Sequence, residues 1–125
     1  MEFNNQLSIY LQIADHVCDR IQLLEWAQDE KIPSVRELAV SLEVNPNTVM
    51  RSYEYLQQLG VIYTRRGLGY FVSPDAVAKI AALRKEQFLR EELPQFFRKI
   101  YLLGIGLDEL KDRFEKFKNR QSKAQ

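Results

Sequence analysis

Apolar residues recur at helical spacing in several stretches of this chain of 125 residues. In the first stretch, from Ser8 to Leu24, apolar positions follow one another at intervals of three or four residues, which places them on one face of a helix. The same period returns over residues 34–42 and 45–59, and again from Asp75 onward. The pattern therefore predicts a mostly helical protein.

Two of these helices begin with residues that cap a helix start. Ser34 stands three residues before Glu37, the spacing of a capping box in which each side chain bonds the other residue's backbone N–H. Asn45 is a favoured N-cap, and Pro46 suits the first helical position because its missing N–H would be unpaired there. Gly60 is the expected left-handed stop of the second helix. Two capped helices with a short turn between them predict a helix-turn-helix.

A two-stranded hairpin is predicted directly after the second helix. Residues 61–64 and 70–72 are rich in β-branched and aromatic side chains, as strands are. The residues between them combine two arginines at the tip with two glycines that permit the positive φ of a tight turn. These residues are Arg65, Arg66, Gly67 and Gly69.

The hairpin completes a recognisable fold class, mostly α with a small β-wing. Pro33 keeps the residue before it extended, so Ile32 is expected to form a one-residue bridge to the wing. We therefore predict a winged helix-turn-helix in residues 1–73, followed by a C-terminal helical hairpin in residues 74–125.

The outward face at the start of the second helix is the candidate DNA-reading surface. In a helix-turn-helix, the first residues of the second helix meet base edges in the major groove. Asn and Arg side chains match the edges of adenine and guanine. The residues expected on this face are Asn47, Thr48, Met50 and Arg51. The same pattern also suits a plain two-helix packing unit, but the arginine-tipped hairpin directly behind it favours nucleic acid.

Charge is divided unevenly along the chain, whose net charge is only +1. Residues 1–73 hold six Lys and Arg against nine Asp and Glu, whereas residues 74–125 hold twelve against eight. The expected DNA-binding half is therefore acidic, and a local patch must supply the attraction to DNA. The arginines expected in this patch are Arg36, Arg51, Arg65 and Arg66. With so few cations, modest affinity per subunit is expected.

Two other function classes compete with DNA binding. The acidic first half slightly favours a winged-helix module that binds a protein partner without specific DNA binding, and ion pairs from Arg51 to acids such as Glu54 would support it. An enzyme is not expected, because the sequence shows no nucleophile triad, phosphate-binding loop or dinucleotide fingerprint. With one His and one Cys, no metal, cofactor or intrachain disulfide is expected.

The sequence also predicts where the protein acts. It has no run of about 18 apolar residues, the length that would suggest a membrane span. Its start lacks the basic-then-apolar pattern of a secretion signal. We therefore expect a cytoplasmic protein that does not cross a membrane.

The segment 74–125 is too rich in large apolar residues for a solvated linker. Pro94 interrupts its helical pattern with a kink or a break, and a turn at residues 103–106 precedes a last helix over 107–118. A short helical hairpin cannot easily bury all its aromatic rings, so an isologous dimer is expected. The candidate dimerisation residues are Phe88, Phe96, Phe97, Ile100, Leu110, Phe114 and Phe117. The alternative is a hairpin that packs back on its own winged helix.

Four blocks of sequence, in order, resemble the winged-helix domain of the GntR family of bacterial transcription regulators. The blocks are residues 10–14, 32–39, 44–49 and 67–72, within a match that spans residues 7–72. The short helical tail and the sequence from Asn45 to Thr48 are similar to the YtrA subfamily. The resemblance implies a homodimeric, sequence-specific DNA-binding regulator, a repressor in the leading hypothesis. It also implies target genes for ABC-type transporters.

The resemblance implies roles for particular residues. Arg36 would contact phosphate or a base, and the start of the second helix would enter the major groove. The wing would place its arginines on the DNA backbone or in the minor groove, shaped by the two glycines. Many family members carry arginine where this chain has Pro46 and Met50, so its base-reading set is reduced. A small-molecule effector of unknown identity is compatible with the short tail, either between the winged helix and the tail or at the dimer seam.

Overall fold

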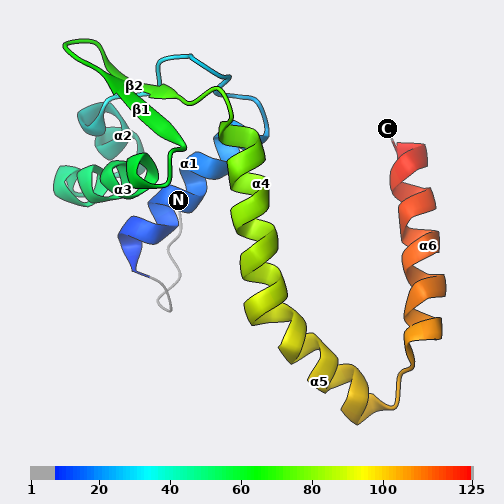
Figure 1. The fold of residues 1–125 in the computed structure, drawn as a ribbon. Coiled ribbons are helices and arrows are strands. Elements are labelled where there is room, and N and C mark those ends of the chain that lie inside the picture. The colour runs from blue at the N-terminus through cyan, green and yellow to red at the C-terminus, as the bar shows by residue number, and fades with distance from the viewer. Residues whose placement is uncertain (1–7, 125) are drawn as a thin grey trace. The chain divides into compact units, whose positions relative to one another are not determined.

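The structure is a computed structural model that describes residues 8–124 (Figure 1). The first seven residues of the predicted winged-helix domain lie outside the described residues. The contacts divide the chain into two compact units, Met1–Leu83 and Arg84–Gln125. The elements run α1 (Ile9–Gln22), α2 (Val35–Leu42), α3 (Pro46–Gln58), β1 (Ile62–Arg65), β2 (Gly69–Val72), α4 (Ala76–Gln87), η1 (Phe88–Glu92), α5 (Leu93–Leu103) and α6 (Leu107–Ala124).

The first unit is a helix-turn-helix with a wing, which confirms the predicted fold class. Its core is built from the predicted apolar stripes, with α1 and α2 both packed on α3. The largest fully buried side chains include Ile13, Ile21, Tyr53, Leu56 and Ile62. The first residues of α4 complete this core, so the packed unit extends beyond residue 73.

The end of α1 differs from the sequence pattern. The helix ends at Gln22, and the residue predicted to close its apolar stripe, Leu24, is 67% exposed with a φ of +61°. The chain turns back here through a left-handed residue, which removes Leu24 from the helical period. The spacing of Leu24 fits the helical period by chance, so the sequence pattern could not show that the helix ends before this residue.

The predicted capping box at the start of α2 is confirmed. The Ser34 hydroxyl accepts from the Glu37 N–H at 3.1 Å, and the Glu37 carboxylate accepts from the Ser34 N–H at 2.9 Å. These bonds favour the charged carboxylate, so they lower the pKa of Glu37 from its ordinary value. The stabilisation that Glu37 supplies is therefore present at neutral pH and is lost as the pH falls through this lowered pKa.

Replacing the cap tests its contribution to stability. Ser34→Ala should lower the free energy of unfolding by about 1 kcal/mol, because one backbone N–H of α2 loses its partner. Urea denaturation followed by the fluorescence of Trp26, the single tryptophan, measures the change. Ser41→Ala on the exposed side of α2 is the matched control and should be neutral or slightly stabilising. Equal losses at both sites would mean that the cap contributes nothing.

The wing is an antiparallel pair, β1 and β2, with Ile62 opposite Val72 and Arg65 opposite Gly69. The predicted extra bridge is present one residue earlier, at Lys31 opposite Phe71, and not at Ile32. The hydrogen bonds that define this bridge are made by the residues on either side of Lys31. The Ile32 N–H donates to the Tyr70 carbonyl at 3.0 Å, and the Glu30 carbonyl accepts from the Val72 N–H. The Ile32 side chain instead fills the core.

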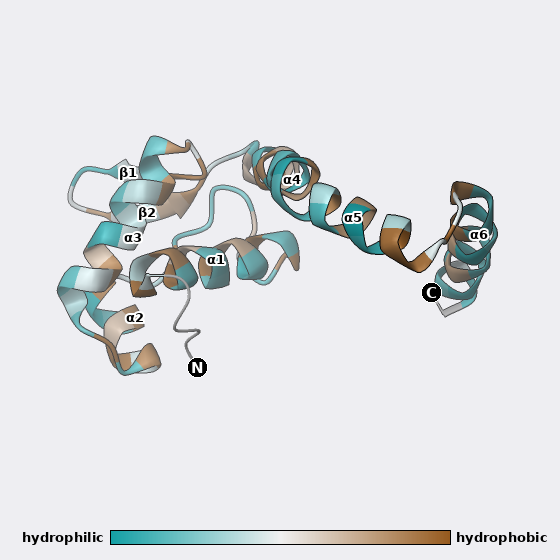
Figure 2. Cartoon of the chain, turned by 90° about the horizontal axis from the view of Figure 1, so that it is seen from below, coloured by the Kyte–Doolittle hydropathy of each residue, from teal (hydrophilic) through white to brown (hydrophobic). Residues whose placement is uncertain are grey.

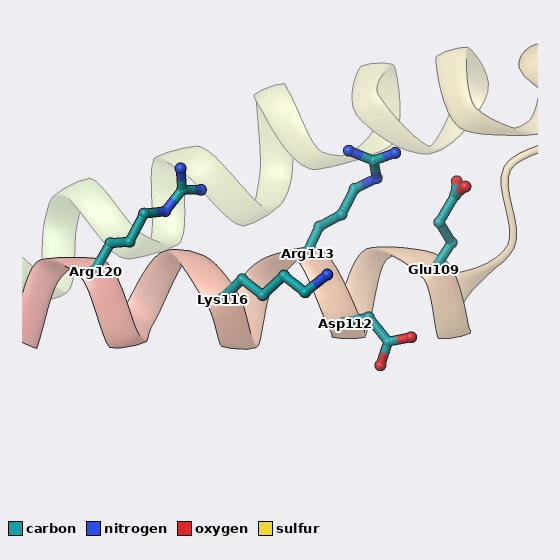
Figure 3. Close-up of a pocket in the computed structure, with 5 residues that line it drawn as sticks. All are labelled: Glu109, Asp112, Arg113, Lys116 and Arg120. Carbon is teal, nitrogen blue, oxygen red and sulfur yellow. The ribbon is translucent and has the colours of Figure 1, made fainter.

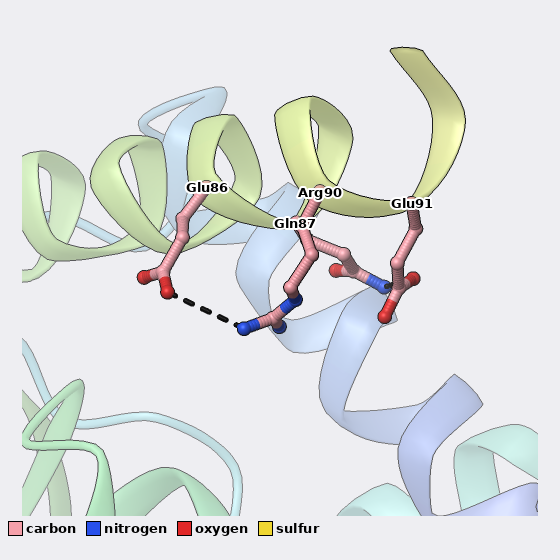
Figure 4. Close-up of polar contacts among 4 residues, drawn as sticks. All are labelled: Glu86, Gln87, Arg90 and Glu91. Atoms are coloured by element: carbon pink, nitrogen blue, oxygen red, sulfur yellow. Dashed lines mark hydrogen bonds and ion pairs between the residues drawn. The ribbon is translucent and has the colours of Figure 1, made fainter. Parts of the chain in front are cut away.

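Helix α4 continues through η1, a π-helical segment, into α5. The Leu93 N–H donates to the Phe88 carbonyl, five residues back, and Pro94 follows at the start of α5. A π turn absorbs the irregularity that a proline imposes, so the predicted interruption is a π segment within a continuing helix. Figure 4 shows the polar contacts around it, with Arg90 bonded to Glu86 at 3.4 Å.

In the second unit, α5 and α6 are joined by a turn in which Gly104 is left-handed, with a φ of +70°. The last helix extends to Ala124, beyond the predicted end at residue 118. Its final turns are polar, so no apolar period marks them, and no glycine or proline stops the helix. No helix within residues 8–124 is long and apolar enough to cross a membrane.

Candidate nucleic-acid interface

The start of α3 is held rigidly by its cap. The Asn45 side-chain oxygen accepts from the Asn47 N–H at 2.8 Å, and Pro46 occupies the first helical turn, both as predicted. The outward side chains of this turn are exposed, except Thr48, which is half-buried. Met50 is 40% exposed, and the Tyr70 hydroxyl lies 3.7 Å from its sulfur. The turn therefore offers polar side chains from a fixed backbone.

Arg51 lies one turn further along α3 and is exposed. Its guanidinium carbon sits 3.8 Å from the centre of the Tyr10 ring, at the start of α1. No ion pair to Glu54 or to another acid within residues 8–124 is found for Arg51. Its positive charge therefore lies on an aromatic ring and is not paired with a carboxylate of the described residues.

Most of these residues, but neither Pro46 nor Met50, border one open depression at the start of α1 and α3. It is lined by Ser8, Ile9, Tyr10, Asn45, Asn47, Thr48 and Arg51. The sequence pattern identified the residues from α3. It did not assign Tyr10 to the interface, although Tyr10 lies off the apolar stripe of α1 and begins the first of the four sequence blocks. Among residues 8–124, no acidic side chain lines this depression, so the described walls offer no repulsion to an anionic ligand.

The two arginines of the wing have different surroundings. Arg65 belongs to β1, and its guanidinium lies 4.6 Å from the centre of the Phe71 ring. It also donates to the Tyr63 hydroxyl at 3.2 Å, while that hydroxyl donates to Asp29 at 2.8 Å. Arg65 is thus folded back along the wing and does not lie at its tip, where the sequence pattern placed it. Arg66 is in the turn itself and is exposed.

The glycines of the wing have the expected backbone. Gly67 and Gly69 have φ angles of +77° and +111°, which L side chains rarely adopt. A Cβ at Gly69 would also come within 3.2 Å of the Lys31 side chain. Lys31 therefore lies against the wing, where it adds a cation that the sequence pattern did not assign. Arg36, in the first turn of α2, is exposed.

Two other hollows have fewer features of a nucleic-acid binding site. The one in Figure 3 is formed along the single helix α6 and holds charges of both signs. Its residues are Glu109, Asp112, Arg113, Lys116 and Arg120. A second hollow, mostly apolar, lies between the loop after α1 and the first turns of α4. Within residues 8–124, no group of three His, Cys, Asp or Glu side chains could hold a metal ion.

A capped, exposed recognition turn followed by a basic wing defines a winged helix-turn-helix of the DNA-binding class. The family model for bacterial regulatory proteins of the gntR family matches residues 9–72, half of the chain. The chain belongs to the GntR family of helix-turn-helix transcriptional regulators, which bind DNA and are not enzymes. This membership favours DNA over a protein partner.

The similarity to known proteins extends over both units of the chain. It is 37% identical over 116 residues to the regulator YhcF of Bacillus subtilis, covering 93% of this chain and 94% of YhcF. The repressor YtrA of Bacillus subtilis is 37% identical over 81 residues, covering 65% of this chain and 62% of YtrA. The crystal structure of a putative GntR-family regulator from Bacteroides thetaiotaomicron is 54% identical, with a TM-score of 0.81, and covers 91% of this chain and 99% of that one.

Proposed function

We propose that this protein is a cytoplasmic, homodimeric repressor that binds a specific operator. The observation that carries the proposal is the exposed first turn of α3, capped by Asn45 and flanked by an Arg51 with no acidic partner within residues 8–124. Residues 1–73 would bind DNA and residues 74–125 would dimerise. The similarity to a repressor, YtrA, supports the sign of regulation. The resemblance to the YtrA subfamily suggests transporter genes as the proposed targets.

Within the interface, the proposed roles follow from side-chain chemistry. Asn47, Thr48 and Arg51 would read base edges in the major groove, while Met50 offers an apolar contact to a thymine methyl group. Arg36, at the first turn of α2, would bind phosphate, and Arg66 would bind the backbone or the minor groove beside the wing. Phosphate contacts would set the register, and the base contacts would set the sequence preference.

Dimerisation is proposed from the apolar surface of the second unit. Its five phenylalanines, Phe88, Phe96, Phe97, Phe114 and Phe117, are each between 43% and 58% exposed. Ile100 and Leu110 are half-buried, and α5 and α6 do not pack along their lengths. Figure 2 shows apolar positions in brown toward the end of α5. A second copy would remove this surface from water, and a two-fold dimer would match an operator of two half-sites.

A titration of the pure protein onto the DNA just upstream of its own gene tests the proposal. The competitor is scrambled DNA of the same composition, and two salt concentrations are used because phosphate attraction weakens steeply with salt. Preference for the upstream DNA that persists at the higher salt is expected. Binding that is equal on both DNAs and vanishes with salt would overturn specific operator binding.

Arg51→Ala tests the proposed base reader. The variant should lose about 1–3 kcal/mol of specific binding free energy and little non-specific binding. Arg20→Ala is the matched control, since it also removes one positive charge but from an ion pair on α1 with Glu25. An equal loss on operator and scrambled DNA would make Arg51 a phosphate contact instead.

The effector is a separate part of the proposal. A ligand regulates binding only if its affinity differs between two arrangements of the dimer. The apolar hollow bordered by Leu24 and Val77 is one place in the first unit that would suit a small apolar molecule.

A further inference from the structure

The arginine proposed to read a base rests on a tyrosine from another helix. We infer that Tyr10 is a positioning residue whose ring holds the Arg51 guanidinium over the start of α3 before DNA binds. The inference rests on the proposed function, because it concerns how one of its base readers is oriented. The contact is close, with 3.8 Å between the guanidinium carbon and the ring centre.

Tyr10 is itself fixed from two sides. Its ring packs edge-on against Tyr55 of α3, with 6.1 Å between ring centres and 84° between ring planes. Its backbone carbonyl accepts from the Ser52 hydroxyl at 2.7 Å, and Ser52 is fully buried. The ring is therefore a rigid support that joins the first turn of α1 to the middle of α3.

A fixed ring matters because an exposed arginine has many rotamers. An unsupported side chain must lose this freedom when it meets a base edge, and that loss weakens binding. A guanidinium that already lies on a ring has lost part of this freedom in the unbound protein. The faces of an aromatic ring attract cations without using the N–H donors at the guanidinium edge. A contact with the ring therefore leaves those donors available to bond a base or a phosphate.

The position of the pair fits this role. Tyr10 and Arg51 line the same open depression as Asn47 and Thr48. Asn47 and Arg51 are four residues apart on α3, so they share a face of the helix. A ring that orients Arg51 therefore places its donors next to the amide of Asn47. Tyr10 would tune the specificity of the surface from α1.

Substitutions at Tyr10 separate a positioning role from a structural one. Tyr10→Phe keeps the ring and should leave the ratio of operator affinity to scrambled-DNA affinity unchanged. Tyr10→Leu keeps a large apolar side chain but removes the ring, and should lower this ratio about two- to fivefold. The ratio is the right readout, because partial unfolding lowers both affinities by the same factor and leaves their ratio unchanged.

A double-mutant cycle with Arg51→Ala completes the test. If Tyr10 acts through Arg51, Tyr10→Leu should have no further effect on the ratio once Arg51 is removed. An undiminished effect in that background, or an unchanged or raised ratio for Tyr10→Leu alone, would overturn the inference. A wild-type ratio near one would instead overturn the proposed function, so the two failures are distinguishable.

Discussion

A charge placed at Phe114 should convert the protein to monomers with poor operator affinity. Phe114 is 58% exposed on α6 and lies on a stripe with Leu110 and Phe117, which the proposed dimer would bury. Phe114→Glu would place a carboxylate in that apolar contact, which is costly to bury even with Lys118 nearby, whose ammonium lies 5.2 Å from the Phe114 ring centre. A monomer also loses the gain from linking two half-sites, so operator affinity should fall by about 10²-fold or more.

Sedimentation velocity and operator titration on the same samples measure both effects. Asn119→Glu is the matched control, because it changes the charge equally on a part of α6 away from the stripe. It should remain a dimer and bind as the wild type does. If Phe114→Glu sediments as an unchanged dimer, α6 has no place in the assembly, and residues 74–125 need another role.

Removing the Tyr53 side chain should destabilise the first unit several times more than loss of the Ser34 cap. The Tyr53 ring is fully buried and lies 4.8 Å from the centre of the Tyr70 ring of the wing. Its hydroxyl donates to the Pro33 carbonyl at 2.7 Å, just before α2. Burial, with the nearby Tyr70, raises the pKa of Tyr53, so the hydroxyl stays protonated and donates at neutral pH. One side chain thus ties α3 to both the wing and α2.

Tyr53→Ala should lower the free energy of unfolding by about 3–5 kcal/mol, which is a large share of the total for a small domain. Tyr53→Phe keeps the ring and should lose only about 1–2 kcal/mol for the hydroxyl bond. Urea denaturation followed at Trp26 measures both. Glu54→Ala, the exposed neighbour, should be near neutral. A loss for Tyr53→Ala no larger than that of the control would show that this junction is unimportant.

The features that the sequence predicted best are local ones. The capping box at Ser34, the cap at Asn45 and the left-handed stop at Gly60 each depend on residues within a few positions of one another. The helical stripes of the core follow from spacing alone. Such signals need no knowledge of what the chain folds against, and they were sufficient to predict the winged helix-turn-helix.

The features that the sequence did not predict depend on partners distant in the chain. Tyr10 meets Arg51 only because α1 crosses α3, and neither residue signals the other. Arg65 was expected at the tip of the wing, yet strand pairing places it beside the Phe71 ring. The position of the bridge at Lys31 depends on the register in which the strands pair, and residue propensities do not determine that register. The net charge of residues 1–73 also gave too weak an indication of DNA binding, because it counts every charged side chain without showing which of them are already paired.

The π segment η1 lies within the second unit, and it changes how the number of residues relates to the rotation of the helix that leads into α5. Each residue of a helix turns the chain by about 100°. A π turn accommodates one residue more than an α turn, so the apolar residues of α5 are out of phase with those of α4. A π turn covers about the same rotation as an α turn, so deletion of one residue within Phe88–Glu92 would restore a plain α-helix and leave the direction of the α5 faces nearly unchanged. A deletion within α5 itself, where no π turn absorbs it, would instead rotate the residues that follow it in that helix by about 100°.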